Sequence, residues 1–267
     1  MARRGITQRY LPSPGPHGPA AARNFGWRAA RGRIIAFTDD DTLPDPDWLV
    51  AGVHAFEEGA DAAWGRIVMP IPREPTDYER DANGLERATF VTANCFCLRS
   101  VLERLGGFDE RFRLAWREDS DLYFRLIGAG ARIVHVPQAL MVHPVRPASW
   151  GVSIRQQRKV MFDALLYKKH PQLYRSRIRA RPRWDYYFIV SALITAVGAW
   201  VAGVAWLAAL AGSIWLAATV AFALKRLRDT TKAPTHVAEM LITSSVIPPL
   251  AAFWRLYGAI KFRTLFG

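Results

Sequence analysis

Three consecutive aspartates, Asp39, Asp40 and Asp41, follow the short apolar run 34–37 after a single residue, Thr38. The β-branched and aromatic residues of that run predict a buried strand. Adjacent carboxylates at the end of a strand repel one another unless a cation is present. Carboxylate oxygens suit Mg²⁺ or Mn²⁺, held together with substrate phosphates. We therefore interpret Asp39 and Asp41 as candidate metal and phosphate residues. The alternative is an acidic loop that caps the next helix, and we favour capping for Asp45 and Asp47.

A second acidic group, Trp116-Arg117-Glu118-Asp119-Ser120-Asp121, opens a predicted helix. The helix dipole favours carboxylates in a first turn, and this alone would explain Glu118 and Asp121. Asp119 differs because it follows the aromatic Trp116 at the mouth of the helix. A carboxylate beside an aromatic ring can serve as a base next to a sugar hydroxyl.

Three further polar residues are candidates for the same site. Arg23 lies one turn into a predicted helix at 18–32, whose N-terminus favours anions, so it is a phosphate ligand or an ordinary surface arginine. Asn94 lies in the apolar run 89–98 and is either a structural cross-link or a ligand for a sugar hydroxyl. His143 follows a strand predicted at 131–136 and is either structural or a metal ligand.

The chain has 267 residues, a formal net charge of +13 and 51% hydrophobic residues. Its basic residues do not form an aromatic-interleaved patch on a nucleic-acid-binding module, so nucleic acid is not an expected partner. They concentrate instead at 151–185, immediately before the apolar tail. We interpret 151–185 as a basic, amphipathic juxtamembrane helix that lies on anionic lipid.

The tail predicts membrane helices. Residues 186–224 are free of charged side chains and long enough for two spans in a tight hairpin. Basic residues flank both ends of the hairpin. Both ends should therefore lie on the cytosolic side of the plasma membrane. A third apolar stretch at 237–257 contains Pro248 and Pro249, and it could be a third span, a re-entrant segment or an interfacial helix.

Taken in order, these pieces resemble the family 2 glycosyltransferases over roughly residues 5 to 145. The matching segments are Gly18–Asn24, Phe37–Asp41, Thr92–Asn94, Gly106–Glu110, Glu118–Leu122 and Val142–His143. The resemblance implies an α/β, glycosyltransferase A (Rossmann-like) domain over 1–150 that lacks its first strands, and the apolar tail adds an α-helical membrane region over 186–267. It implies transfer of a sugar from a nucleotide-diphosphate sugar with inversion. Together with the membrane region, this leads us to expect a lipid-linked or cell-envelope glycan acceptor.

The resemblance also assigns roles. It implies that Asp39 and Asp41 bind the metal, that His143 completes the metal shell, and that Asp40 lies near the ribose or the sugar. Asp119 would be the general base. We assign Arg23 and Asn94 to the donor side, and Trp116 and Glu118 to the acceptor side.

One departure from the family pattern is also expected to matter. The first strands of the family, which hold the nucleotide base, have no counterpart in this sequence, so we expect weak or absent nucleotide binding unless a partner supplies those strands. Two alternatives therefore stay open: a non-catalytic, membrane-anchored pseudoglycosyltransferase or subunit, and a metal-dependent nucleotidyltransferase.

Overall fold

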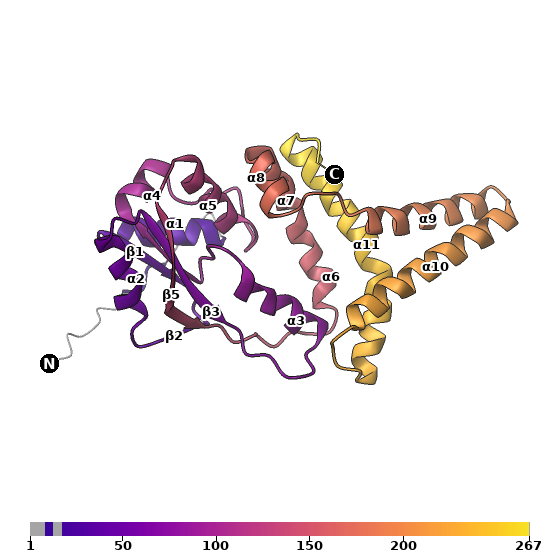
Figure 1. Cartoon of the computed structure of the whole chain (residues 1–267). Coiled ribbons are helices and arrows are strands. Elements are labelled where there is room, and N and C mark those ends of the chain that lie inside the picture. Colours follow the sequence, from indigo (N-terminus) through magenta and orange to yellow (C-terminus); the bar gives the residue numbers. More distant parts are fainter. Residues whose placement is uncertain (1–8, 13–17, 267) are drawn as a thin grey trace.

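The computed structural model describes residues 9–12 and 18–266. An α/β domain forms one end of the molecule, and two long helices project from the other end (Figure 1). This arrangement confirms the predicted α/β class with an apolar, helical C-terminal region.

The domain is built on one mixed sheet of five strands in the order β1-β4-β3-β5-β2. The strands are β1 (Ile34–Thr38), β2 (Leu43–Pro44), β3 (Ala62–Val68), β4 (Asn94–Leu98) and β5 (Ile133–Val142). β4 is antiparallel to both β1 and β3, whereas β3 and β5 are parallel. Side chains alternate between the two faces: Cys95 and Cys97 belong to one buried cluster, and Phe96 belongs to the other.

Helices cover both faces of the sheet. On one face, α1 (Pro19–Ala29), α4 (Arg99–Leu105) and α5 (Glu118–Gly128) pack over β1 and β4. On the other face, α2 (Trp48–Glu57) packs over β3, β4 and β5. The short helices α3 (Asp77–Asn83) and η1 (Gly84–Arg87) follow β3. Both buried clusters include side chains from the strands that precede the acidic residues. Packing therefore holds these strands, and the residues at their ends, in fixed positions.

Asn24 fastens α1 to the loop that precedes α5. Its buried amide donates to the Phe108 carbonyl at 2.8 Å and accepts from the Phe108 N–H at 2.8 Å and the Trp27 indole at 2.9 Å. Gly107 has a φ of +71°, and a Cβ there would lie 2.4 Å from the Asn24 amide oxygen. Glycine is therefore required at this contact, which sets the position of α1 against α5.

The basic segment after β5 differs from the single juxtamembrane helix that we expected. It folds as α6 (Val152–Gln156), η2 (Gln157–Val160), α7 (Met161–Lys169) and α8 (Pro171–Arg177). Residues Met161–Leu166 are buried, and Phe162 and Leu165 belong to the same core cluster as β1. Its cations are also used inside the protein, because Lys169 and His170 lie 2.5 Å and 3.1 Å from buried Asp121. The segment therefore packs against the α/β domain.

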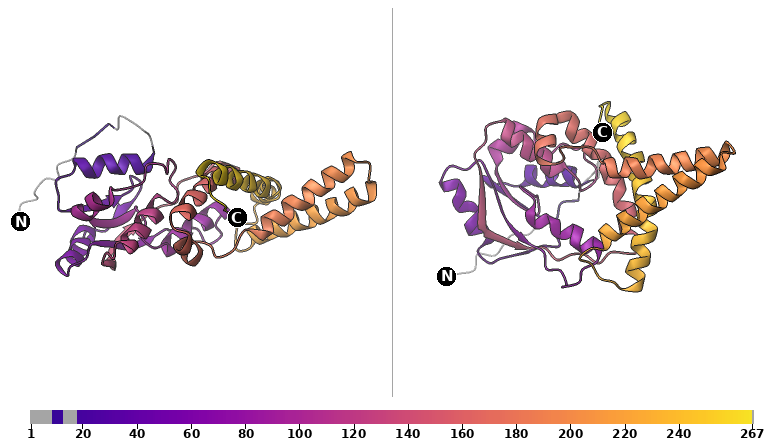
Figure 2. Two further views of the ribbon diagram at one scale, coloured as in Figure 1. Left: turned by 90° about the horizontal axis from the view of Figure 1, so that it is seen from above. Right: turned by 45° about the vertical axis from the view of Figure 1, so that its right-hand side comes forward.

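Three long apolar helices follow: α9 (Trp184–Val201), α10 (Ala205–Leu227) and α11 (Pro234–Phe262). By length and composition, all three could cross a membrane. α9 and α10 form the projecting hairpin in both views of Figure 2, and at 1.5 Å per residue they are about 27 and 35 Å long. The hairpin therefore matches the thickness of a bilayer core of about 30 Å.

α11 crosses the base of the hairpin and lies against the α/β domain (Figures 1 and 2). Near its start, Glu239 accepts a hydrogen bond from the Gly151 N–H at 2.7 Å. Near its end, a Cβ on Gly258 would lie 2.5 Å from the Met161 carbonyl oxygen, so the two backbones are in close contact. The apolar side chains Leu241, Phe253 and Leu256 remain exposed on α11. The domain thus contacts α11 at both of its ends.

Candidate active site

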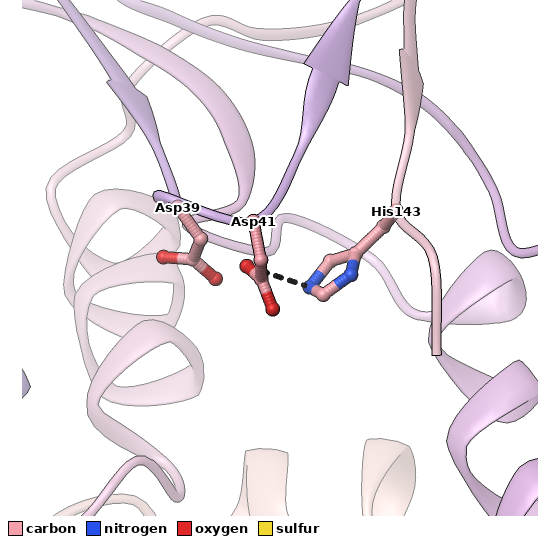
Figure 3. A group of neighbouring side chains, drawn as sticks. All are labelled: Asp39, Asp41 and His143. Carbon is pink, nitrogen blue, oxygen red and sulfur yellow. Dashed lines mark ion pairs between the residues drawn. The ribbon is translucent and has the colours of Figure 1, made fainter. Parts of the chain in front are cut away.

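Two aspartates and one histidine converge at the ends of two strands. Asp39 and Asp41 follow β1, and His143 follows β5. One ligand atom from each lies within 4.8 Å of the others, and all three residues are half-buried. Figure 3 shows Asp41 between Asp39 and His143, with the His143 Nε2 atom 3.8 Å from an Asp41 oxygen. The predicted trio is therefore brought together.

Arg23 joins this trio to the second acidic group. Its guanidinium donates to an Asp39 oxygen at 2.9 Å and to a Glu118 oxygen at 2.9 Å. The side chain of Arg23 is only 16% exposed, so both ion pairs are shielded from bulk water. Arg23 lies on α1, which Asn24 fastens to the core, and the cation is consequently held between β1 and α5.

The two carboxylates at the start of α5 are in different environments. Glu118 is buried, and burial together with the neighbouring Asp119 charge raises its pKa to about 7, although Arg23 opposes the shift. Within the described residues, the second oxygen of Glu118 has no hydrogen-bond partner. A proton on that oxygen is consistent with the raised pKa.

Asp119 accepts a hydrogen bond from the Ser120 backbone N–H at 2.6 Å. Burial raises its pKa, and the bond from Ser120 and the charges of Arg117 and Arg23 limit that rise. A carboxylate with a raised pKa is a better proton acceptor than an ordinary surface aspartate.

The loop before α5 is held by a residue that we had not selected from the sequence. Asp163 of α7 accepts from the Trp116 indole at 2.9 Å and from Arg117 at 2.7 Å. Arg117 also lies over the Trp116 ring at 4.4 Å and has a φ of +75°, which is rare for a residue with a side chain. The signal in the sequence is weak: Asp163 is the one acid within the basic residues 151–183.

Arg146 is a second residue that the sequence reasoning missed. It lies three residues after His143 and pairs with both Asp40, at 2.7 Å, and Asp41. The Asp40 side chain is 92% exposed and is not part of the cavity wall described next. A cation bound by Asp39, Asp41 and His143 would therefore contact Asp41 together with Arg146.

A cavity of about 760 Å³ unites these groups. Its wall includes Arg23, Asp39, Asp41, Trp116, Glu118, Asp119, His143 and Arg146. Seven of our nine predicted site residues thus line one cavity. Its volume is in the range of small-molecule sites.

Asn94 lies outside that wall, and its contacts favour the structural alternative. Its oxygen accepts from the Trp48 indole at 2.8 Å, and its amide nitrogen donates to the carbonyls of Arg66 and Ala139 at 3.0 and 2.8 Å. The residue is fully buried, so no hydrogen of the amide is left for a sugar. Asn94 cross-links α2, β3 and β5 beneath the site.

Comparison with known proteins agrees with this geometry. Residues 5–113 match the family described as "Glycosyl transferase family 2". This stretch is a family 2 glycosyltransferase domain. In the glycosyltransferase domain, Arg23 and the three aspartates fall inside the match, whereas Asp119 and His143 follow it and are placed by the structure.

Curated relatives support the same conclusion. "Pre-mycofactocin glycosyltransferase" of Mycobacterium tuberculosis is 35% identical over 152 residues, which is 51% of this chain and 32% of that protein. "Glycosyltransferase AglE" of Haloferax volcanii is 29% identical over 54% of this chain and 49% of its own length. "Probable glycosyltransferase YdaM" of Bacillus subtilis is 27% identical over 53% of this chain and 37% of its own length. The chain thus spans between a third and a half of these relatives.

The glycosyltransferase site also fits a divalent cation. Two carboxylates and an imidazole are suitable ligands for such an ion, and the trio has the required spacing. Both aspartates already have arginine partners, Arg23 and Arg146, so these side chains would share the carboxylates with the ion.

Proposed function

We propose that the chain is an inverting glycosyltransferase that moves a sugar from a nucleotide-diphosphate sugar to a hydroxyl of a lipid-linked or cell-envelope glycan acceptor. The observation that carries this proposal is the Arg23 bridge, 2.9 Å to Asp39 and 2.9 Å to Glu118, beside Asp119 in one cavity. A donor phosphate near Asp39 and an acceptor hydroxyl near Asp119 can meet in that cavity. Neither group alone would support a transferase.

The chemistry follows from these positions. Asp119 takes the proton of the acceptor hydroxyl while the hydroxyl oxygen attacks the anomeric carbon from the face opposite the diphosphate. The bond from the anomeric carbon to the diphosphate oxygen breaks, the nucleoside diphosphate leaves, and Asp119 keeps the proton. Arg23 supplies positive charge beside the phosphates.

Asp39, Asp41 and His143 are the residues that would hold Mg²⁺ or Mn²⁺. When bound, such an ion neutralises negative charge on the leaving diphosphate. The protein holds these three ligands in position. The aspartates are held by the end of the strand that they follow. The backbone of His143 is held by the hydrogen bond from its N–H to the Val68 carbonyl at 2.8 Å.

We further propose that the α9–α10 hairpin spans the plasma membrane with the catalytic domain in the cytoplasm, and that α11 lies along the membrane surface. A spanning α11 would carry one of its ends about 30 Å away from the domain. Instead, Glu239 and Gly258 contact the domain near the two ends of the helix. Its exposed side chains, such as Phe253 and Leu256, would enter the lipid interface.

The test is transfer by the full chain in its membrane fraction, with a panel of nucleotide sugars and with Mn²⁺ or a chelator. Asp119→Asn should lower turnover by about 10²–10⁴-fold and leave donor binding intact. Asp45→Asn is the control for the chemical change from aspartate to asparagine, because Asp45 lies near the metal-site aspartates in the sequence but does not line the cavity.

The outcomes separate the alternatives. Turnover by Asp119→Asn at the wild-type rate would refute the role of Asp119 as the general base. No transfer by the wild type with any donor would favour a pseudoglycosyltransferase. Release of pyrophosphate rather than a nucleoside diphosphate would favour a nucleotidyltransferase. Turnover that is unchanged by the chelator would remove the metal from the proposal.

A further inference from the structure

A second cavity, of about 940 Å³, lies at the base of the α9–α10 hairpin. Its wall comes from α3, from the linker 179–183 that precedes α9, and from the ends of α9 and α10. Because the hairpin matches the thickness of a bilayer, its base lies at the level of the lipid headgroups. We refer to this space as the hairpin-base cavity.

The hairpin-base cavity has a surplus of positive charge. Seven arginine and lysine side chains line it, against three aspartates. Two of the aspartates are already paired, Asp77 with Arg80 and Arg226, and Asp185 with Arg183. The remaining cations form no ion pair within residues 9–12 and 18–266; they are Arg179, Arg181, Lys225 and Arg228.

Arg179 is half-buried in the cavity wall, whereas Arg181, Lys225 and Arg228 are exposed at its mouth. Burial lowers the pKa of Arg179, and repulsion from Arg183 and Arg255 lowers it further. Asp81 is the one aspartate of this wall that forms no ion pair within the described residues, so the four remaining cations still outnumber it. A surplus of like charges is stabilised by a bound anion.

Apolar and aromatic groups line the same cavity. Tyr186 and Phe222 pack edge to face at 5.3 Å, and the Arg183 guanidinium lies 3.7 Å from the centre of the Tyr186 ring. Both rings belong to the helices of the hairpin. A ligand with an anionic head and an apolar chain matches this combination better than a soluble anion does.

The hairpin-base cavity adjoins the catalytic cavity. Tyr78, Asp81 and Gln156 line both spaces. A headgroup bound among the hairpin-base cations is therefore next to the wall that carries Asp119.

We propose that the hairpin-base cavity binds the phosphate ester of a membrane lipid through Arg179, Arg181 and Lys225. The lipid chain would lie along the exposed apolar side of the hairpin. That this lipid is also the sugar acceptor rests on the proposed transferase activity, whereas the binding rests only on the proposed membrane-spanning position of the hairpin.

The experiment measures lipid retention by the full chain, without any donor. The chain is released from micelles that contain equal amounts of dioleoyl phosphatidic acid and dioleoyl phosphatidylcholine, and the retained lipids are identified by native mass spectrometry. We expect selective retention of the phosphatidic acid. A basic residue near an anionic surface changes affinity by about fivefold, so Arg179→Gln/Arg181→Gln/Lys225→Gln should weaken retention by roughly a hundredfold.

The matched control is Arg31→Gln/Arg33→Gln/Arg104→Gln, which removes the same charge from exposed residues that do not line the cavity. It should retain the lipid as the wild type does. If the triple variant of the cavity fails to fold, Arg181→Gln/Lys225→Gln replaces it, because both residues are exposed, and roughly a 25-fold loss is expected.

Three results would overturn the proposal: equal retention of both lipids, equal loss in the cavity and control variants, or displacement of the lipid by free inorganic diphosphate at matched concentration. The last result would indicate a site for a soluble anion. Loss of lipid selectivity with intact sugar transfer would refute this inference alone, whereas selective retention without transfer would refute only the proposed function.

Discussion

Asn94→Asp tests whether the amide of Asn94 is a cross-link or a sugar ligand. The substitution keeps the shape of the side chain and the oxygen that accepts from Trp48 at 2.8 Å. In the wild type, the amide nitrogen lies 3.0 and 2.8 Å from the carbonyl oxygens of Arg66 and Ala139. The substitution puts a carboxylate oxygen in place of this nitrogen. Two donated hydrogen bonds become two contacts between acceptors.

The expected cost follows from these contacts. Each lost hydrogen bond removes about 1 kcal/mol, and a buried acceptor left without a partner costs about 1–3 kcal/mol. A carboxylate that stays ionised here adds to the cost, because Asn94 is fully buried. We expect a total of about 3–5 kcal/mol and a fall in Tm of roughly 10 °C.

The assay is scanning fluorimetry of the full chain in detergent, together with donor KM. Asn83→Asp is the matched control, because Asn83 is half-buried and donates a single bond, to the Met69 carbonyl at 3.1 Å. It should cost about 1 kcal/mol. An unchanged Tm for Asn94→Asp with a raised donor KM would refute the cross-link and restore the sugar ligand.

Two further predictions concern the start of α5 and the membrane helices. Because burial raises the pKa of Glu118 from 4.5 to about 7, the folded state binds a proton that the unfolded state releases between those values. Stability should therefore fall by about 2–3 kcal/mol from about pH 5 to pH 8, and Glu118→Gln should remove that fall; equal slopes in thermal unfolding would contradict it. For the membrane, single cysteines at Ala233 and Leu265, which flank α11, should react with an impermeant maleimide only from the cytoplasmic side, and one at Ala202 in the hairpin turn only from the other side. Labelling of the first two from opposite sides would mean that α11 spans.

Local patterns predicted the strand that precedes the three aspartates and the helix that carries Arg23, whereas the α/β class came from the family resemblance. The apolar run before Asp39 predicts a buried strand whose end carries the carboxylates, and β1 ends at Thr38. Pro19 in the first turn predicts the start of α1. These signals depend on residues that are neighbours in the chain, and the family resemblance joins them in the correct order. The domain boundaries at 150 and 185 remain predictions.

The contacts made by single polar residues could not be predicted in the same way. The sequence around Asn94 is equally compatible with a cross-link and a ligand, because the choice depends on Trp48 and Ala139, each more than forty positions away. Asp163 is comparable: its partner Arg117 lies 46 positions earlier in the chain. Periodicity reports which face of an element is apolar, but it does not report which distant residue will neutralise a charge.

The net charge of +13 illustrates the same limit and leads to the proposed lipid site. By composition, every arginine and lysine is equally available for an anionic surface. The structure divides them, because Lys169 pairs with buried Asp121 and Arg23 pairs with Asp39 and Glu118. A paired cation has little charge left for lipid, since its field is cancelled locally. Arg179, Arg181 and Lys225 form no ion pair within the described chain, and they differ from other unpaired cations because they line one cavity at the base of the hairpin.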